Sequence, residues 1–252
     1  MKTNIADLII SPTGENMQYF NDGENEYLQS SSGKKYSISQ NIIHFLNDVA
    51  LTGNNLLYQK MYDKLSVFYD LITRFYAKIK SGNERNRLME YLSLLKVSDA
   101  DKVIEISIGT GRNIKYLNPH ATYYGVDISL GMLKQCYKNM KKINREITLI
   151  HAEAENLSLK EESFDVVFSA GGFNFFNDPG KAVNEMLRIA KSGTKILISD
   201  ETEKLRQKHK NNKFYKNNEI KNPTEYLPDY CKNIEYKEIC NGDLYALTFY
   251  KP

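Results

Sequence analysis

The chain has 252 residues, of which 41% are hydrophobic and 26% charged, a composition typical of soluble globular proteins rather than of disordered ones. The apolar stretch around Leu8–Ile10 is too short for a membrane-spanning helix or a signal peptide, so we expect a cytoplasmic protein without a membrane span. The net charge of +3 is too balanced to indicate a nucleic-acid binder by itself.

The cysteines and histidines do not form a metal-binding pattern. The cysteines Cys136, Cys231 and Cys240 are scattered and odd in number, which is typical of reduced thiols in a cytosolic protein. The four histidines lack the His-Glu-x-x-His spacing of zinc hydrolases. We therefore expect no metal.

The first part of the chain is predicted to contain small hairpins followed by helices. Residues 1–47 alternate turn signals, such as Asp22-Gly23, with short apolar segments. Residues 55–80 are predicted to form one amphipathic helix, because apolar side chains recur there at every third or fourth position. Ser81-Gly82-Asn83 is expected to break this helix before a second one begins near Leu88.

The central part alternates between the two types of element. Strands are predicted at 103–108, 123–128, 147–150, 164–168 and 195–199, with helices at 129–143 and 179–190. This alternation predicts βαβ units and a parallel sheet. A polar, basic segment at 202–230 follows. The tail at 234–239 and 244–250, about Asn241-Gly242-Asp243, is predicted to form a terminal antiparallel hairpin.

A glycine turn follows the first predicted strand of this region. It contains Gly109 and Gly111, and Glu105 lies on the strand just before it. The third glycine of a dinucleotide fingerprint would fall on Ile114, and the phosphate-loop pattern is absent. A carboxylate at this place would repel a pyrophosphate, so the turn favours a ligand that carries positive charge.

A second acid follows at the end of the next strand. Asp127 lies 22 residues after Glu105, where an acidic side chain accepts hydrogen bonds from the ribose hydroxyls of a nucleoside. The two acids together indicate a cationic adenosine compound, and S-adenosylmethionine satisfies this description. Ordinary turn glycines in another doubly wound fold, or Asp127 as the cap of the helix at 129–143, are the plainer alternatives.

At these residues the chain resembles the class I S-adenosylmethionine-dependent methyltransferases, in particular the type of ubiquinone and menaquinone biosynthesis. The resemblance covers about residues 55–201. The segments that carry it are Glu105–Gly111, Gly125–Leu133, Ala152–Leu157, Phe164–Val167 and Leu187–Gly193. It departs from the family pattern where Ser107 replaces a glycine, Ile108 a small residue, Glu153 an aspartate and Ser192 a proline.

The resemblance implies an α/β fold with a Rossmann-like seven-stranded sheet, helices on both faces and a terminal antiparallel β-hairpin. We expect the methyltransferase domain at 48–252, with a lid helix at 55–80. Glu105 would contact the methionine amine, Asp127 the ribose, Ile128 and Met132 the sugar or adenine, and Glu153 and Ala154 the adenine edge. The full set of cofactor-binding residues implied is Glu105, Ser107, Gly109, Gly111, Asn113, Asp127, Ile128, Met132, Glu153, Ala154 and Ser169.

Residues 1–47 are similar to small zinc ribbons that precede some RNA methyltransferases or activate RNA-modifying enzymes. The positions of the metal ligands are occupied by Ser11, Gly14, Gln29 and Ser32, so no zinc site is expected. We interpret this β-rich appendage as a degenerate ribbon. An unrelated β-hairpin arm is the alternative.

The family's reaction implies methyl transfer (EC 2.1.1 class) to a small organic acceptor beyond the fourth and fifth strands. Tyr62, Tyr69, Phe173 and Asn174 are the substrate candidates, and Tyr69, His151 and Asn174 are weak candidates for a catalytic role. A satisfied structural role is the plainer interpretation of His151. The motifs of DNA amino and cytosine C5 methyltransferases are absent. The sequence does not identify the acceptor atom, a general base or the oligomeric state.

Two alternatives remain open for the function. The run Lys204, Arg206, Lys208, His209, Lys210, Lys213 and Lys216 keeps an RNA methyltransferase under consideration, although a solvated loop is the plainer interpretation. The altered glycine turn and the missing ribbon ligands keep a cofactor-binding protein without methyl transfer under consideration.

Overall fold

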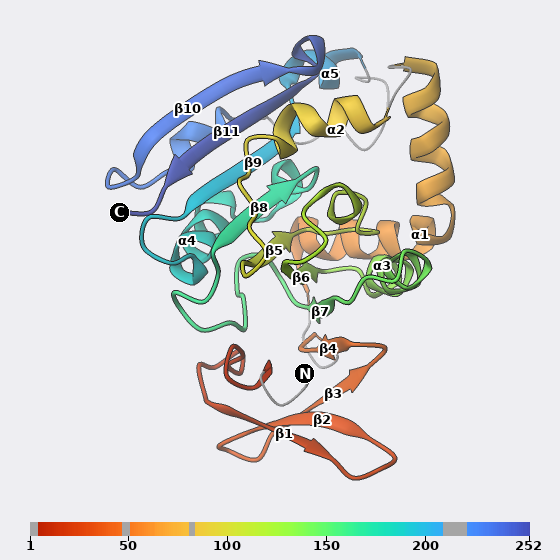
Figure 1. Cartoon of the computed structure of the whole chain (residues 1–252), viewed down its shortest axis with the longest axis vertical. Helices are drawn as coiled ribbons and strands as arrows, with labels where there is room; N and C mark the ends of the chain where they lie inside the picture. Colours follow the sequence, from red (N-terminus) through yellow and green to blue (C-terminus); the bar gives the residue numbers. More distant parts are fainter. Residues whose placement is uncertain (1–4, 47–50, 81–83, 209–220) are drawn as a thin grey trace.

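The structure is a computed structural model that describes residues 5–46, 51–80, 84–208 and 221–252. Its described part forms an α/β fold around one mixed sheet of eleven strands, in the order β1-β2-β3-β4-β7-β6-β5-β8-β9-β11-β10 (Figure 1). The strands are β1 Met17–Asn21, β2 Glu26–Ser30, β3 Lys35–Ser39, β4 Ile42–His44, β5 Lys102–Ile106, β6 Thr122–Asp127, β7 Thr148–His151, β8 Val166–Ala170, β9 Lys195–Glu201, β10 Lys232–Ile239 and β11 Leu244–Tyr250. The α-helices are α1 Gly53–Lys80, α2 Glu84–Leu92, α3 Leu130–Lys142, α4 Pro179–Ile189 and α5 Glu203–Lys208.

The middle of the sheet is parallel. The neighbouring strands in the series β7, β6, β5, β8 and β9 all pair in parallel. Parallel strands are joined by crossover connections rather than by tight hairpins. β11 is antiparallel to both β9 and β10. The carboxyl ends of the five parallel strands therefore meet at one edge of the sheet, where ligands bind in open α/β folds.

The N-terminal strands extend this same sheet, which differs from the expectation of a seven-stranded sheet with a separate appendage. β4 pairs in parallel with β7, with Ile42 opposite Leu149 and His44 opposite His151. β3, β2 and β1 follow as an antiparallel meander. The pairing covers the edge of β7 and buries Ile42, Ile43 and Phe45, and this burial joins the segment to the rest of the fold.

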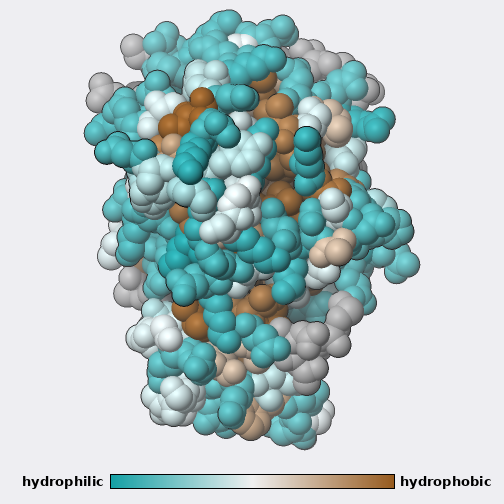
Figure 2. Space-filling view, turned by 60° about the vertical axis from the view of Figure 1, so that its left-hand side comes forward, coloured by the Kyte–Doolittle hydropathy of each residue, from teal (hydrophilic) through white to brown (hydrophobic). Residues whose placement is uncertain are grey.

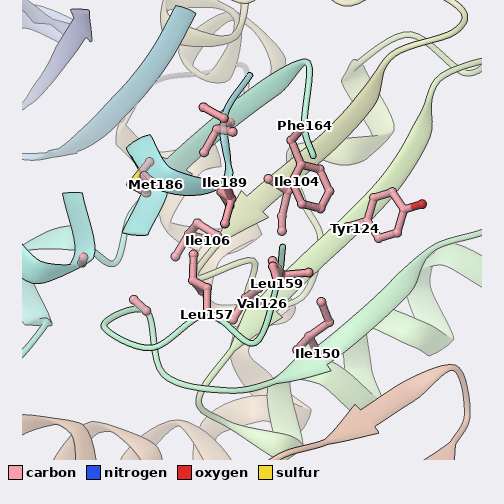
Figure 3. Close-up of a cluster of buried hydrophobic side chains, with 14 of the residues drawn as sticks. Ile104, Ile106, Tyr124, Val126, Ile150, Leu157, Leu159, Phe164, Met186 and Ile189 are labelled. Carbon is pink, nitrogen blue, oxygen red and sulfur yellow. The ribbon is translucent and has the colours of Figure 1, made fainter. Parts of the chain in front are cut away.

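The sheet is covered by apolar cores on both faces. On one face, side chains of β5, β6 and β7 pack against the segment 157–164 and α4, as Figure 3 shows for Ile104, Val126, Leu159 and Met186. On the other face, α2 and α3 bury Leu92, Leu133 and Cys136 against the strands. Successive side chains of a strand point to opposite faces of the sheet. Because both faces are covered here, both sets of side chains are apolar, which explains the near-continuous apolar runs in the sequence.

The face of the molecule drawn in Figure 2 is mostly hydrophilic. The side at left in Figure 1, turned forward in Figure 2, shows hydrophilic side chains with apolar areas between them. Among the helices of the described residues, none has both the length and the apolar character that crossing a bilayer requires. The expected helix break at 81–83 and the basic positions 209–216 lie outside the described residues.

One carboxylate joins two turns of the N-terminal segment. The turns are 11–15 and 30–34, and Glu15 accepts hydrogen bonds from Thr13 Oγ1 at 3.1 Å, Ser31 Oγ at 3.0 Å and Ser32 Oγ at 3.0 Å. The Ser32 amide adds a bond of 2.9 Å. No group of three metal-ligating side chains occurs in the part of the chain that the structure describes. An anion surrounded by hydroxyl groups thus connects the two turns of this segment.

Candidate functional site

Glu105 is the most deeply buried acid of the sheet's carboxyl edge. Its side chain is 0% exposed on β5, and Asn113 Nδ2 donates a 2.5 Å hydrogen bond to its Oε1. The Tyr91 hydroxyl donates to Asn113 Oδ1 at 2.7 Å. Oε2 has no hydrogen-bond partner among the described residues. Burial, with a smaller contribution from nearby Asp127, raises the pKa of Glu105 well above its ordinary value.

The backbone after β5 makes the tight turn that the sequence predicts. Ser107, Gly109 and Gly111 all have positive φ, at 63°, 56° and 76°. A Cβ on Gly111 would lie 2.7 Å from Cys136 Sγ, so a side chain there would displace α3. Ser107 replaces the first glycine of the family pattern, yet it adopts the backbone conformation that favours glycine.

Asp127 lies at the end of β6 and is bonded to this turn. Its Oδ2 accepts a 2.8 Å hydrogen bond from the Gly109 amide, and its Oδ1 accepts one of 2.8 Å from the Ser129 amide. Burial raises the pKa of Asp127 to about 6, although these backbone bonds act in the opposite direction. The N-cap of α3 is Ser129, whose Oγ accepts from the Met132 amide, so capping by itself does not explain Asp127.

A small cavity of about 30 Å³ lies beside Asp127, whereas Glu105 is not part of its lining. Its lining includes four of the predicted cofactor residues, Ser107, Asp127, Ile128 and Ala154. The lining also contains residues that sequence reasoning did not assign to the site: Asn55, Ile106, Val126, Ala152, Glu155 and Phe176. Ala152 and Glu155 belong to a segment that the sequence did single out, whereas nothing in the local pattern marks Asn55.

Asn55 connects α1 to the segment after β7. Its Nδ2 donates to Glu153 Oε1 at 2.8 Å and to Glu155 Oε2 at 3.2 Å. The other oxygen of Glu155 accepts from the amides of Asn177 and Asp178 before α4. Glu153 and Glu155 therefore both take part in holding α1 against this edge of the sheet.

Two aspartates fix the middle of α1 over the site. Asp63 Oδ1 accepts hydrogen bonds from Ser129 Oγ at 2.6 Å and from the Gly131 amide at 2.8 Å. Asp70 accepts from Thr110 Oγ1 at 2.5 Å, in the glycine turn, and from Asn139 Nδ2 at 2.6 Å. These bonds hold the middle of α1 against the glycine turn and α3. The function of this helix as a lid stays a prediction.

The predicted acceptor residues lie in three places: on the inner side of α1, at the carboxyl end of β9 and in the core. Tyr62 and Tyr69 are neighbours on the inner side of α1, with ring centroids 6.0 Å apart, and burial raises both of their pKa values. The Asn174 amide donates to Asp200 Oδ2 at 2.9 Å, so Asn174 lies at the carboxyl end of β9. Phe173, in contrast, is 2% exposed and packs against Phe176 and Tyr226 in the core.

His151, a candidate for a catalytic role, is not among the residues that line the cavity. Its Nε2 is 3.1 Å from the carbonyl oxygen of Ile128, and its ring lies 6.0 Å from that of His44 on β4. Burial lowers its pKa, which keeps the imidazole neutral. Its position between strands fits a structural role. The other predicted cofactor residues also lie outside the cavity lining: Glu105, Gly109, Gly111, Asn113, Met132, Glu153 and Ser169. Ser169 is 0% exposed near the end of β8.

Comparisons with known proteins identify the family. A family model described as a methyltransferase domain matches residues 104–198. The chain is 29% identical over 142 residues to a demethylmenaquinone methyltransferase of Thermotoga maritima, covering 55% of this chain and 59% of that protein. It is 30% identical over 177 residues to an uncharacterised protein of Methanocaldococcus jannaschii, covering 68% and 82%. The chain belongs to the class I S-adenosylmethionine-dependent methyltransferases.

A solved structure shows the same fold. An S-adenosylmethionine-dependent methyltransferase from Thermotoga maritima superposes with a TM-score of 0.56 at 21% identity, over 76% of this chain and all of that one. The chain spans about three fifths of the length of the curated methyltransferase named above.

The site of this methyltransferase fits the family's cofactor, S-adenosylmethionine, in its chemistry. A buried carboxylate oxygen without a partner, Glu105 Oε2, suits an ammonium group, and Asp127 suits ribose hydroxyls. The cavity of about 30 Å³ has room for only one or two water molecules. Asn55 of α1 is one of the residues that line this cavity.

Proposed function

We propose that the protein transfers a methyl group from S-adenosylmethionine to a small organic acceptor. The observation that carries the proposal is the pair of buried acids, Glu105 and Asp127, at the carboxyl ends of two adjacent parallel strands and on either side of one glycine turn. Two carboxylates taken out of water are costly unless a positive or hydroxyl-rich ligand compensates them. This requirement favours a cationic nucleoside as the ligand.

The cofactor would supply an electrophilic methyl carbon on a good leaving group, so alignment provides most of the catalysis. Glu105 would hold the amino group, with Asn113 and Tyr91 fixing its carboxylate. Asp127 would accept hydrogen bonds from the ribose hydroxyls, and Ala154 would pack at the adenine. Tyr62 and Tyr69, from the inner side of α1, would exclude water from the reacting atoms.

The acceptor would bind beyond the ends of β8 and β9, near Asn174 and Asp200. Asn174 is held in place, since its side chain donates to the Glu201 carbonyl at 2.9 Å and its Oδ1 lies 3.3 Å from the Tyr245 hydroxyl. A demethylmenaquinone methyltransferase is among the relatives. A quinone-like aromatic compound is therefore the first acceptor to test.

The described part of the basic run supports a small acceptor over RNA. Lys204 donates to the Asn241 carbonyl, Arg206 is 6% exposed, and Lys208 pairs with Asp243 at 2.7 Å. These three side chains bind to the protein itself, which leaves them little charge to offer to a phosphate backbone.

Incubation with methyl-labelled S-adenosylmethionine and fractionated cell extract tests the proposal. We expect label in a small organic fraction, at a rate that falls at least about a hundredfold in Asp127→Ala, because the ribose anchor is lost. Label in RNA would favour the RNA methyltransferase. Cofactor binding without label in any fraction would favour a protein that binds the cofactor without methyl transfer.

A further inference from the structure

One face of α1 exposes large apolar side chains to solvent. Leu57, Val67, Phe68 and Leu71 are 57%, 72%, 61% and 69% exposed. They recur at helical spacing together with Lys60 and Lys64, which are also exposed. We call these six residues the outer face of α1. They span an arc of about 100° around the helix axis.

The rest of this helix segment has partners within the fold. Tyr58 and Ser66 are buried on the opposite side, which faces the cofactor site. The acids of residues 53–71, Asp63 and Asp70, are bonded to the glycine turn and to α3. The outer face therefore carries two lysines and no acid, and its apolar side chains stay exposed in the part of the chain that the structure describes. Figure 1 shows the first part of α1 near the middle of the molecule, close to α3, and its later part along one outer side.

The helix packed beside α1 adds positive charge. α3 has no acidic residue, and its lysines Lys134, Lys138, Lys141 and Lys142 are all exposed. The two neighbouring helices thus combine exposed Phe, Val and Leu side chains with a row of lysines. A helix with apolar and lysine residues on its free face is typical of segments that lie in the headgroup region of a bilayer.

We infer that the outer face of α1 docks the protein on a membrane surface with anionic headgroups. Phe68, Leu71, Val67 and Leu57 insert at the headgroup boundary, while the lysines of α1 and α3 contact the negative lipid phosphates. A second copy of this chain is a poorer occupant, because a two-fold interface across this face would bring Lys60 and Lys64 against their own equivalents. The inference does not depend on the proposed reaction.

Vesicle co-sedimentation of the full chain tests the inference. The probes are vesicles of phosphatidylcholine alone and vesicles in which one third is replaced by phosphatidylglycerol. We expect binding to the anionic vesicles that weakens as salt is raised. Phe68→Ser with Leu71→Ser, and separately Lys60→Glu with Lys64→Glu, should each weaken binding about tenfold or more.

The matched control is Ile234→Ser on β10, which removes an apolar side chain that is 47% exposed at the far edge of the sheet. Its vesicle binding should equal that of the unaltered chain, and circular dichroism should show that each variant is folded. Absence of binding to anionic vesicles would overturn the inference. Equal binding by the unaltered chain and the α1 variants, or a concentration-dependent dimer that Phe68→Ser dissociates, would overturn it too.

Discussion

Asn113 Nδ2 and Glu105 Oε1 are joined by a hydrogen bond of 2.5 Å in the interior of the protein. This bond favours the charged form of a carboxyl group whose pKa burial raises. Tyr91, from α2, fixes Asn113 from its other side. A chain of two hydrogen bonds thus connects a helix on one face of the sheet to the acid that we assign to the cofactor's amino group.

Removal of this bond should shift the pH dependence of cofactor binding. Glu105 must be ionised to hold an ammonium group, so affinity falls as the pH drops through its raised pKa. In Asn113→Ala the pKa rises further, and the loss of affinity begins at higher pH. Calorimetric titration with S-adenosylhomocysteine across pH checks this. Tyr91→Phe keeps the inner bond and should shift the profile less, whereas an unchanged profile in Asn113→Ala would contradict the role of the bond.

Ser107→Gly should stabilise the protein. Ser107 has a φ of 63°, a conformation that costs non-glycine residues about 1 kcal/mol. Because glycine also gains entropy in the unfolded chain, we expect a net gain of about 0.5 kcal/mol in the free energy of unfolding, measured by urea denaturation. The matched control is Gly109→Ala, where a Cβ meets no atom within 4 Å but φ is +56°. That change should destabilise the protein by about 1 kcal/mol, and a gain there would contradict the strain argument.

Asp200→Asn should stabilise the protein above neutral pH. Asp200 is 2% exposed, and burial, together with the nearby Glu201, raises its pKa to about 7. Between its unfolded pKa and this value, the unfolded chain loses the proton first, so stability falls as pH rises through that window. We expect a gain of about 1–2 kcal/mol at pH 8 and little change at pH 4, measured by thermal and urea unfolding.

Asp165 provides a comparison of opposite sign. Burial acts to raise its pKa, but hydrogen bonds from Lys191 and from the Lys102 amide outweigh it and lower the pKa. Asp165→Asn should therefore lower stability at neutral pH and have no such effect in acid. If each variant changed the free energy of unfolding by the same amount at pH 4 and at pH 8, the two assignments would be contradicted.

Glu15→Ala should loosen the N-terminal segment. The hydroxyl of Ser32, followed by Ser31 and Thr13, lowers the pKa of Glu15. The contribution of Glu15 to stability is present above its pKa in the unfolded chain and is lost as the pH falls through its lowered pKa in the folded protein. Hydrogen exchange of residues 11–33 should increase in Glu15→Ala at neutral pH. Glu24→Ala, an exposed acid on the same meander, should leave exchange unchanged; equal exchange in both variants would show that Glu15 does not hold the turns together.

The central sheet and its two acids could be predicted from the sequence, because they are encoded in patterns of residues that are close together along the chain. Apolar runs, the glycine turn and the spacing of Glu105 and Asp127 are all visible in the sequence. The pairing of β4 with β7 and the bond from Asn55 to Glu153, which spans 98 positions, depend on contacts between distant segments. Phe173 is itself one of the predicted substrate residues, and the structure buries its large apolar ring in the core.

Calorimetry with S-adenosylhomocysteine at pH 8 tests the central claim most directly, with Glu105→Gln and Asp127→Asn as the variants. Each change keeps the shape of the side chain and removes its negative charge. We predict saturable binding to the unaltered chain and a loss of affinity of about tenfold or more in each variant. Absence of binding to the unaltered chain, or equal affinity in all three proteins, would contradict a nucleoside site between β5 and β6.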